Sequence, residues 1–158
     1  MAWHFGFLAD GTGDPRPQFF DELRKVVGRR GSIVVYNQSF EEGILNDLAE
    51  AYPEHQPWVE QACARLADLL QPFRNFSYYH PDQKGSASIK HVLPALTGQS
   101  YDDMEIGKGD EASLAYLDIM SGKMTAAEKT RTRADLEKYC TLDTEGMIWI
   151  VNKLREMV

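Results

Sequence analysis

Hydrophobic positions along the chain follow two patterns, helical spacing and short continuous runs. Helical spacing first appears at Phe19, Phe20, Leu23, Val26 and Val27. It predicts an amphipathic helix that stops at Gly31. The next segment, residues 32–37 (SIVVYN), is apolar over 33–36, which predicts a strand buried on both faces of a sheet. Residues 3–9 (WHFGFLA), followed by a turn rich in Gly and Pro, predict another short strand.

Several later segments also show a helical pattern. Residues 37–39 offer helix-capping side chains ahead of a second apolar stripe. That stripe consists of Phe40, Ile44, Leu45, Leu48 and Ala49. Residues 58–73 begin as a helix, and their ADLLQPF stretch fits either a strand or an extended piece. Further helices are expected at 89–96, at 110–121 and from near Thr125 to the C-terminus.

This order of strand, helix, strand and helix predicts one α/β domain spanning residues 1–158. A chain of this length can bury one hydrophobic core. It has neither an apolar run of about 18 residues nor the start of a signal peptide, so a cytoplasmic location without a membrane partner is expected. The formal net charge of -7 disfavours broad binding to a phosphate backbone, so any contact with nucleic acid is expected to be local.

Two short motifs place acidic side chains where chemistry is expected. Asn37-x-x-Phe40-Glu41 stands where a strand passes into a helix, the edge at which open α/β sheets bind ligands. Tyr139-x-x-x-Asp143 has the spacing that puts a phenol and a carboxylate on one helical face. Each motif alone also fits an ordinary structural role, as a helix start or as a common helical pair. Only their combination favours a functional site.

With both motifs in this order, the sequence resembles the DEDD 3'-to-5' exonucleases of the RNase H-like superfamily, in the variant with a tyrosine in the last motif. NQSFE (37–41) resembles the second motif and YCTLD (139–143) the third. FLAD, DPR, IVVYNQSFE, YYHPDQKGSASIKHVLPAL and YCTLDT resemble more closely a bacterial domain family of unknown function, number 2779. The resemblance implies an RNase H-like fold, a mixed sheet flanked by helices, with its first two strands missing.

The resemblance also implies the site residues. Glu41, Tyr139 and Asp143 would be catalytic, Glu41 and Asp143 would be metal ligands, and Asp68 would be a further ligand. Two Mg²⁺ or Mn²⁺ ions would activate a water and stabilise the leaving oxygen during phosphodiester cleavage. The first motif of these enzymes, Asp-x-Glu, has no match here, because Asp10 and Asp14 lie in a turn after the wrong strand.

Two partners are expected from the same resemblance. A sheet without its first two strands leaves an open edge, which predicts self-association through that edge. A surface for single-stranded DNA or RNA is expected at Asn37, Tyr79, His80, Lys84 and Lys90, because aromatic faces stack on bases and cations meet phosphate. The competing interpretation, in which the tyrosines of the YYH segment only pack within the fold, is the stronger one for those residues.

Two functions from different classes therefore stay open. The first is a 3'-to-5' exonuclease domain for single-stranded nucleic acid, weak or inactive as this chain alone. The second is a non-catalytic protein-binding or architectural module of a larger protein, which the absent first motif favours. A small-molecule enzyme has little support, because no phosphate-cradling Gly loop, nucleophile elbow or dinucleotide fingerprint is present.

Overall fold

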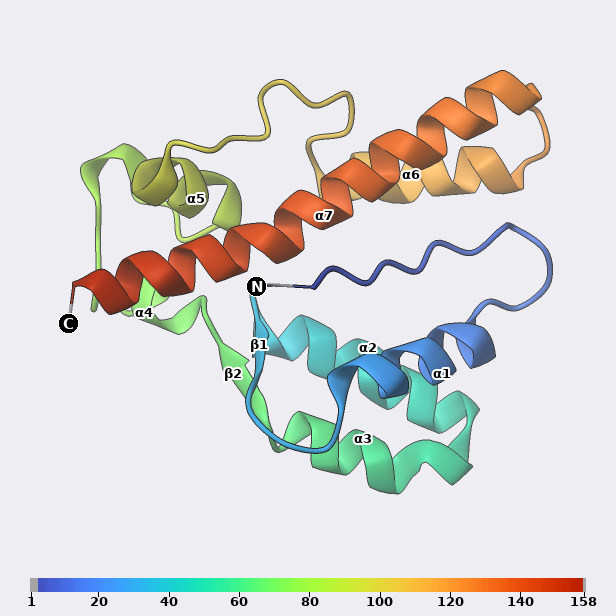
Figure 1. Ribbon diagram of the computed structural model, residues 1–158, viewed down its shortest axis with the longest axis horizontal. Coiled ribbons are helices and arrows are strands. Elements are labelled where there is room, and N and C mark those ends of the chain that lie inside the picture. Colours follow the sequence, from blue (N-terminus) through green and yellow to red (C-terminus); the bar gives the residue numbers. More distant parts are fainter. Residues whose placement is uncertain (1–2, 158) are drawn as a thin grey trace.

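The computed structural model describes residues 3–157, and 62% of these residues are helical. The first half contains α1 (Arg16–Val27), β1 (Ile33–Val35), α2 (Gln38–Ala51), the short 3-10 helix η1 (Pro53–His55), α3 (Gln56–Cys63), β2 (Leu66–Asp68) and α4 (Gln71–Arg74). The second half contains η2 (Pro81–Gln83), α5 (Ile89–Thr97), α6 (Gly109–Met120) and α7 (Ala126–Glu156). The helix α7 runs across the whole molecule (Figure 1). Within the described residues, no helix combines the length and apolar character needed to cross a membrane.

The strands β1 and β2 form a two-stranded parallel sheet, with Ile33 opposite Leu66 and Val35 opposite Asp68. The connection between them passes through α2 and α3, as a parallel pair requires. The expected RNase H-like mixed sheet flanked by helices is therefore wrong for residues 3–157, which form a mostly helical fold. Each strand is only three residues long. Most of the other buried apolar residues between 3 and 157 lie in helices or loops.

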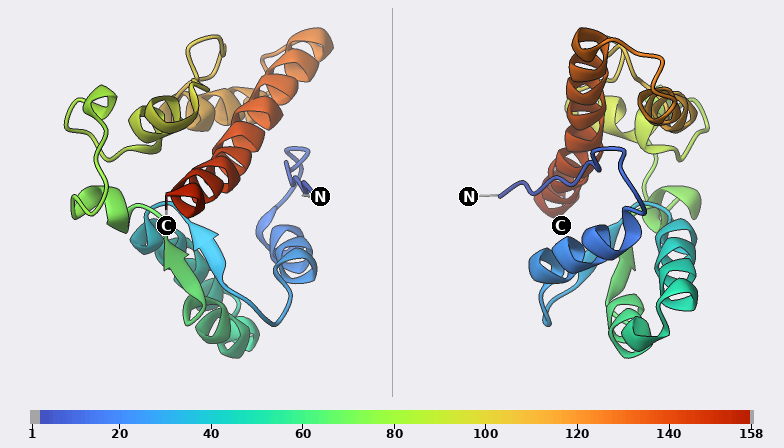
Figure 2. Two further views of the ribbon diagram at one scale, coloured as in Figure 1. Left: turned by 60° about the vertical axis from the view of Figure 1, so that its left-hand side comes forward. Right: turned by 90° about the vertical axis from the view of Figure 1, so that its right-hand side faces the viewer.

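Residues 3–9 form no strand, which corrects the expectation for this segment. The guanidinium of Arg133 on α7 donates hydrogen bonds to the backbone carbonyls of Leu8 and Ala9, at 2.8 and 2.6 Å. Farther along α7, Thr141 Oγ1 lies 3.3 Å from His4 Nε2. Side chains of α7 thus engage the segment from one side, and it lies beside that helix in the views of Figures 1 and 2.

The first hydrophobic core lies between α1, α2 and α3, which group together below α7 in Figure 1. Its buried members are Phe20, Leu45, Leu48, Ala49, Val59 and Ala62. The apolar spacing that predicted α1 and α2 is therefore confirmed, since each helix buries part of its stripe. Residues 58–73 form the end of α3, then β2 and the start of α4, so the first residues of the ADLLQPF stretch are in a strand, whereas its last three are helical and not extended.

The second core lies between α5, α6 and α7. Its buried members are Leu69, Phe73, Val92, Leu93, Tyr101, Ile106, Ile119, Leu136, Tyr139 and Ile150. The helix α7 starts with a capping box in which the Thr125 side chain accepts from the backbone of Glu128 and the Glu128 carboxylate accepts from that of Thr125. Its Gly146 lets α5 approach closely, because a Cβ there would lie 3.0 Å from Leu93 Cδ2.

One face of the sheet is left uncovered, and α2 exposes apolar side chains on the other side, beside a cavity that Val35 also lines. Val34 is 40% exposed, Phe40 64% and Ile44 43%, whereas Val35 is buried. The strand expected to be buried on both faces is therefore buried on one, because no helix among residues 3–157 covers its other side. This open face belongs to the half of the molecule that carries Glu41.

Candidate functional site

Asp68 ends β2 at the carboxyl edge of the sheet. Its Oδ1 accepts hydrogen bonds from the backbone N–H groups of Asn37 and Leu70, both at 3.0 Å, and its Oδ2 accepts one from Gln71 Nε2 at 3.1 Å. Burial raises the pKa of this carboxyl, but the hydrogen-bond donors outweigh burial, so the pKa of Asp68 lies below its ordinary value. The ionised carboxylate thus ties the end of β2 to the start of α2.

Asn37 takes the left-handed backbone conformation, with φ at 82° and ψ at 72°, directly before α2. Asparagine adopts this region more readily than most residues with a side chain. The expected side-chain cap is wrong, since Asn37 makes no capping hydrogen bond and its Oδ1 instead accepts one from the Ser39 hydroxyl at 3.0 Å. The turn at Asn37 sets the direction in which α2 leaves the sheet, and with it the position of Glu41.

Glu41 lies in the first turn of α2, half-buried among apolar side chains. It lines a cavity of about 230 Å³ together with residues such as Val35, Phe40 and Leu45. Its Oε2 is buried and has no hydrogen-bond partner within residues 3–157. Burial raises the pKa of Glu41, and the nearby charge of Asp68 acts in the same direction. A carboxyl in such surroundings resists ionisation unless a cation or a donor joins it.

A second polar group joins α5, the loop 98–108 and α7, and we call its four residues, Lys90, Tyr101, Tyr139 and Asp143, the Lys90 cluster. Lys90 Nζ lies 4.4 Å from the ring centroid of Tyr101 and 4.7 Å from that of Tyr139. It also donates hydrogen bonds to the Gly107 carbonyl and to the Tyr139 hydroxyl. The Tyr101 hydroxyl donates to Asp143 Oδ1 at 2.5 Å. One cation, two phenols and one carboxylate thus converge at the second core.

Burial is the main cause of the pKa shifts of Lys90, Tyr101 and Tyr139 in this cluster. Tyr101 is 6% exposed and Tyr139 8%. Burial raises the pKa of both phenols, and the carboxylate of Asp143 raises both further. Burial lowers the pKa of Lys90, while the charge of Asp143 opposes that change. The phenols therefore stay protonated, and available as hydrogen-bond donors, well above their ordinary range.

Tyr36 connects the sheet edge to the Lys90 cluster. It follows β1, its hydroxyl donates to the Ala87 carbonyl at 2.5 Å, and its ring stacks on Phe73. Burial raises the pKa of Tyr36 and the charge of Asp68 adds to the effect, while Tyr36 in turn contributes to the raised pKa of Tyr101. Tyr36 thus lies near Asp68 at the sheet edge and near Tyr101 of the Lys90 cluster.

The expected site residues thus fall into two groups. Tyr139, Asp143 and Lys90 come together in one cluster, while Glu41 and Asp68 lie near each other at the sheet edge. Within residues 3–157, however, no three side chains of His, Cys, Asp or Glu are arranged so that they could hold a metal ion.

The remaining expected substrate residues build a local turn around η2. His80 caps η2, its Nδ1 accepting from the Asp82 N–H at 3.2 Å, and the Tyr79 hydroxyl accepts from the Gly85 N–H at 3.3 Å. Lys84 ends η2 in the left-handed region. The Tyr79 hydroxyl oxygen and His80 Nδ1 thus act as acceptors within the turn itself.

Tyr101 is the member of the Lys90 cluster that the sequence motifs do not reveal. It lies in a loop without a periodic pattern, 42 positions before Asp143. Tyr101 belongs to the cluster because it is buried beside α7, where its hydroxyl donates to Asp143. No local signal in the sequence predicts this contact.

The fold and the site together define a mostly helical protein with a short parallel strand pair and acidic and phenolic side chains near its carboxyl edge. The profile of the family described as Domain of unknown function (DUF2779) matches residues 2–88, more than half of the chain. The chain belongs to this family.

Two relatives carry no functional description in their names. The chain is 29% identical to "Uncharacterized protein MG366 homolog" of Mycoplasma pneumoniae (strain ATCC 29342 / M129 / Subtype 1) over an alignment of 139 residues that covers 80% of this chain and 21% of that protein. It is 28% identical to "Uncharacterized protein MG366" of Mycoplasma genitalium (strain ATCC 33530 / DSM 19775 / NCTC 10195 / G37), with the same coverage. The chain thus spans about a fifth of the length of these curated relatives. No solved structure matches it.

Proposed function

We propose that this chain forms one part of a metal-dependent 3'-to-5' exonuclease acting on single-stranded nucleic acid, and that it does not cut by itself. The observation that carries the proposal is the Lys90 cluster, in which the tyrosine and the aspartate of the YCTLD motif meet a cation. Glu41 of the NQSFE motif adds a buried carboxyl oxygen without a partner within residues 3–157, as expected of a group that receives a ligand.

The residues of this chain do not by themselves fit the two Mg²⁺ or Mn²⁺ ions that such an enzyme uses. Asp143 already accepts a hydrogen bond from Tyr101, and Asp68 accepts three from its neighbours. The described part of the chain holds no group of three potential ligands. Further carboxylates would have to come from other segments of a longer polypeptide.

The test is digestion of a 5'-labelled single-stranded oligonucleotide with Mn²⁺. We expect no shortening by the isolated chain and a ladder shortening from the 3' end by the polypeptide that the complete reading frame encodes. Asp143→Asn in that polypeptide should abolish the ladder, because the motif loses its only carboxylate. Glu145→Gln is the matched control, since Glu145 is an exposed acid on the same helix, and it should digest like the parent.

Two results would contradict the exonuclease proposal. Equal digestion by the Asp143→Asn variant would remove Asp143 from the site. Absence of digestion by the complete polypeptide, with either ion and with both DNA and RNA, would favour the second candidate, a non-catalytic binding module. That candidate has an observation of its own, because Asp68 and Asp143 both accept the hydrogen bonds of ordinary structural carboxylates.

We also propose that the chain self-associates through its sheet. Each strand pairs with only one neighbour within residues 3–157, and Val34 and Phe40 expose apolar surface beside it. Light scattering coupled to size exclusion should show a species larger than one chain. Replacing both Val34 and Phe40 by Thr should shift it towards the monomer, whereas a parent protein that elutes as a monomer at every concentration would contradict the proposal.

A further inference from the structure

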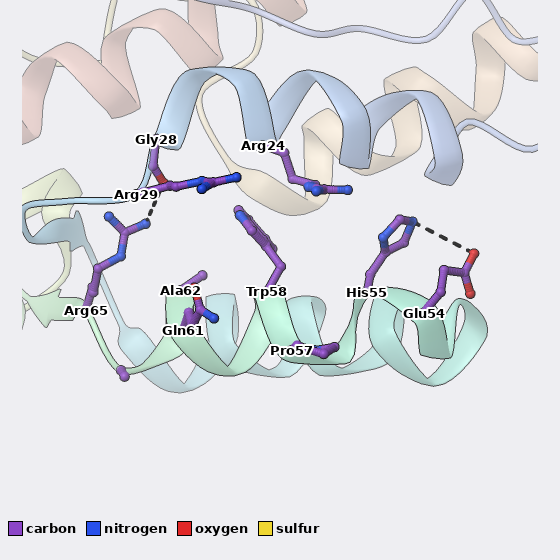
Figure 3. Close-up of a pocket in the computed structure, with 11 residues that line it drawn as sticks. Arg24, Gly28, Arg29, Glu54, His55, Pro57, Trp58, Gln61, Ala62 and Arg65 are labelled. Carbon is purple, nitrogen blue, oxygen red and sulfur yellow. Dashed lines mark hydrogen bonds and ion pairs between the residues drawn. The ribbon is translucent and has the colours of Figure 1, made fainter.

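A cavity of about 600 Å³ opens between α1 and α3, on the far side of α1 from the N-terminal segment, and we call it the basic cleft (Figure 3). Its principal lining residues are Arg24, Arg29, His55, Trp58, Gln61 and Arg65. In Figure 3, Arg24 and Arg29 reach into the space from the α1 side, and His55 and Trp58 reach into it from the α3 side. The basic cleft contains none of the residues of the candidate exonuclease site.

The three arginines of the basic cleft are not neutralised by acids of the chain. None of them lies within 4.0 Å of a carboxylate in the part of the chain that the structure describes. The one acid in the lining, Glu54, lies 3.9 Å from His55 Nε2 instead. The net charge of the chain is -7, so its overall electrostatic potential is negative. The three guanidiniums make the potential in the basic cleft locally positive. It favours an anionic ligand.

Contacts with the core hold the cleft in shape. Phe20 is completely buried, and the His55 ring stacks on it at 4.1 Å between centroids. The Trp58 ring meets Phe20 edge-on at 5.0 Å, and the Arg24 guanidinium lies 5.8 Å from the centre of the same Phe20 ring. On the other side, Arg65 donates to the carbonyl of Gly28 at 3.0 Å. These contacts position an aromatic side chain next to the arginines.

We propose that the basic cleft binds a nucleotide phosphate, with Arg24 and Arg29 on the phosphate oxygens and Trp58 beside the base. Guanidinium groups pair with phosphate through two parallel hydrogen bonds, and aromatic rings stack on bases of any sequence. A volume of about 600 Å³ lies within the ordinary range for small-ligand pockets. The same chemistry is offered by a free mononucleotide and by the 5'-phosphorylated end of a strand. The inference does not rest on the proposed exonuclease function.

Isothermal titration of the intact chain with four probes tests this inference. The probes are thymidine 5'-monophosphate, a 5'-phosphorylated oligothymidylate, the same oligonucleotide without that phosphate, and a glutamate-rich peptide. We expect the phosphorylated oligonucleotide to bind more tightly than the unphosphorylated one, and the peptide not to compete. Binding of the mononucleotide as well would identify free nucleotides as a source, and binding of the strand alone would identify strand ends.

The matched variants remove two positive charges each from the same region. Arg24→Gln with Arg29→Gln should weaken binding of the phosphorylated probe by about tenfold or more, since a charge-assisted hydrogen bond is lost at each residue. Lys25→Gln with Arg30→Gln changes the net charge equally, but these residues do not line the cleft, and less than about twofold weakening is expected. All four positions are exposed, and thermal unfolding by circular dichroism verifies that both variants fold.

Three results would overturn the inference. The first is absence of binding by both phosphorylated probes. The second is equal weakening by the two pairs of substitutions, which would mean that overall charge and not the cleft attracts the ligand. The third is competition by the glutamate-rich peptide at the affinity of the phosphorylated strand, which would assign the cleft to an acidic protein segment.

Discussion

Phe20→Ala is expected to lower the free energy of unfolding by about 3–5 kcal/mol, because it removes a ring that is completely buried and leaves a cavity behind. Phe20 contacts residues of several elements, with His55 stacked on it at 4.1 Å and Trp58 edge-on at 5.0 Å. A domain of this size is stable by only about 5–15 kcal/mol, so the loss is a large share of the total. Urea unfolding followed by circular dichroism measures it.

The control for Phe20 is the same change at an exposed position. Phe5 is 66% exposed in the segment beside α7, and Phe5→Ala should change the free energy of unfolding by no more than about 0.5 kcal/mol. If the two variants lost equal stability, Phe20 would not be a buried member of the core between α1, α2 and α3. A Phe20→Leu variant should recover much of the loss, because it refills most of the cavity.

Alkaline pH is expected to destabilise the protein steeply above about pH 10, where an ordinary tyrosine ionises. Burial raises the pKa of Tyr101 and Tyr139 in the folded chain, so there the folded state binds more protons than the unfolded state does. Stability is therefore lost as pH rises, by about 1.4 kcal/mol per pH unit for each tyrosine and about 3 kcal/mol for the two together. Burial also raises the pKa of Tyr36, so Tyr36 adds to the loss of stability as pH rises.

Lys90 has the opposite effect on stability over a limited range of pH. Burial lowers its pKa, so the folded state releases this proton before the unfolded state does and gains stability as pH rises towards the ordinary lysine value of about 10.4. Above that value both states have lost the proton and the tyrosines act alone. The full slope is thus expected only above about pH 10.5.

Urea unfolding at a series of pH values between neutral and alkaline measures this slope. The double variant Tyr101→Phe with Tyr139→Phe should be less stable at neutral pH, because Asp143 loses its hydrogen-bond donor, but should lose stability much less steeply in alkali. Tyr79→Phe is the control, since Tyr79 is 45% exposed, and it should retain the parent slope. An unchanged slope in the double variant would show that these phenols do not resist ionisation.

The helices were predictable because each buries its own apolar stripe against a neighbour. Residues 19–27, 40–49 and 125–156 carry the helical period in their own sequence, and the Thr125 capping box marks a start that needs no distant partner. The mixed sheet was wrong for a related reason. An apolar run such as 33–35 predicts a strand, but how many strands join it depends on segments that the run does not specify.

The candidate site also combines features that the local sequence predicts with contacts that it does not. Tyr139 and Asp143 share a helical face by their spacing alone, and Glu41 follows a strand by its place in the motif. The contacts of Lys90 with two rings, and of Tyr101 with Asp143, join positions up to 49 residues apart. Such contacts follow from how α5 and the loop 98–108 pack on α7, which no local pattern encodes.

By itself, the sequence determined where several amphipathic helices lie, that one short strand precedes α2, and that one acidic motif follows that strand while the other lies on one face of a helix. Only the tertiary structure decided that the N-terminal segment lies along α7 without pairing as a strand, that Lys90 joins Tyr139, and that three arginines gather around Trp58. The physical reason is the separation along the chain between the residues that interact. Helix formation depends on side chains three or four positions apart, whereas a site and a cleft depend on which buried surfaces meet.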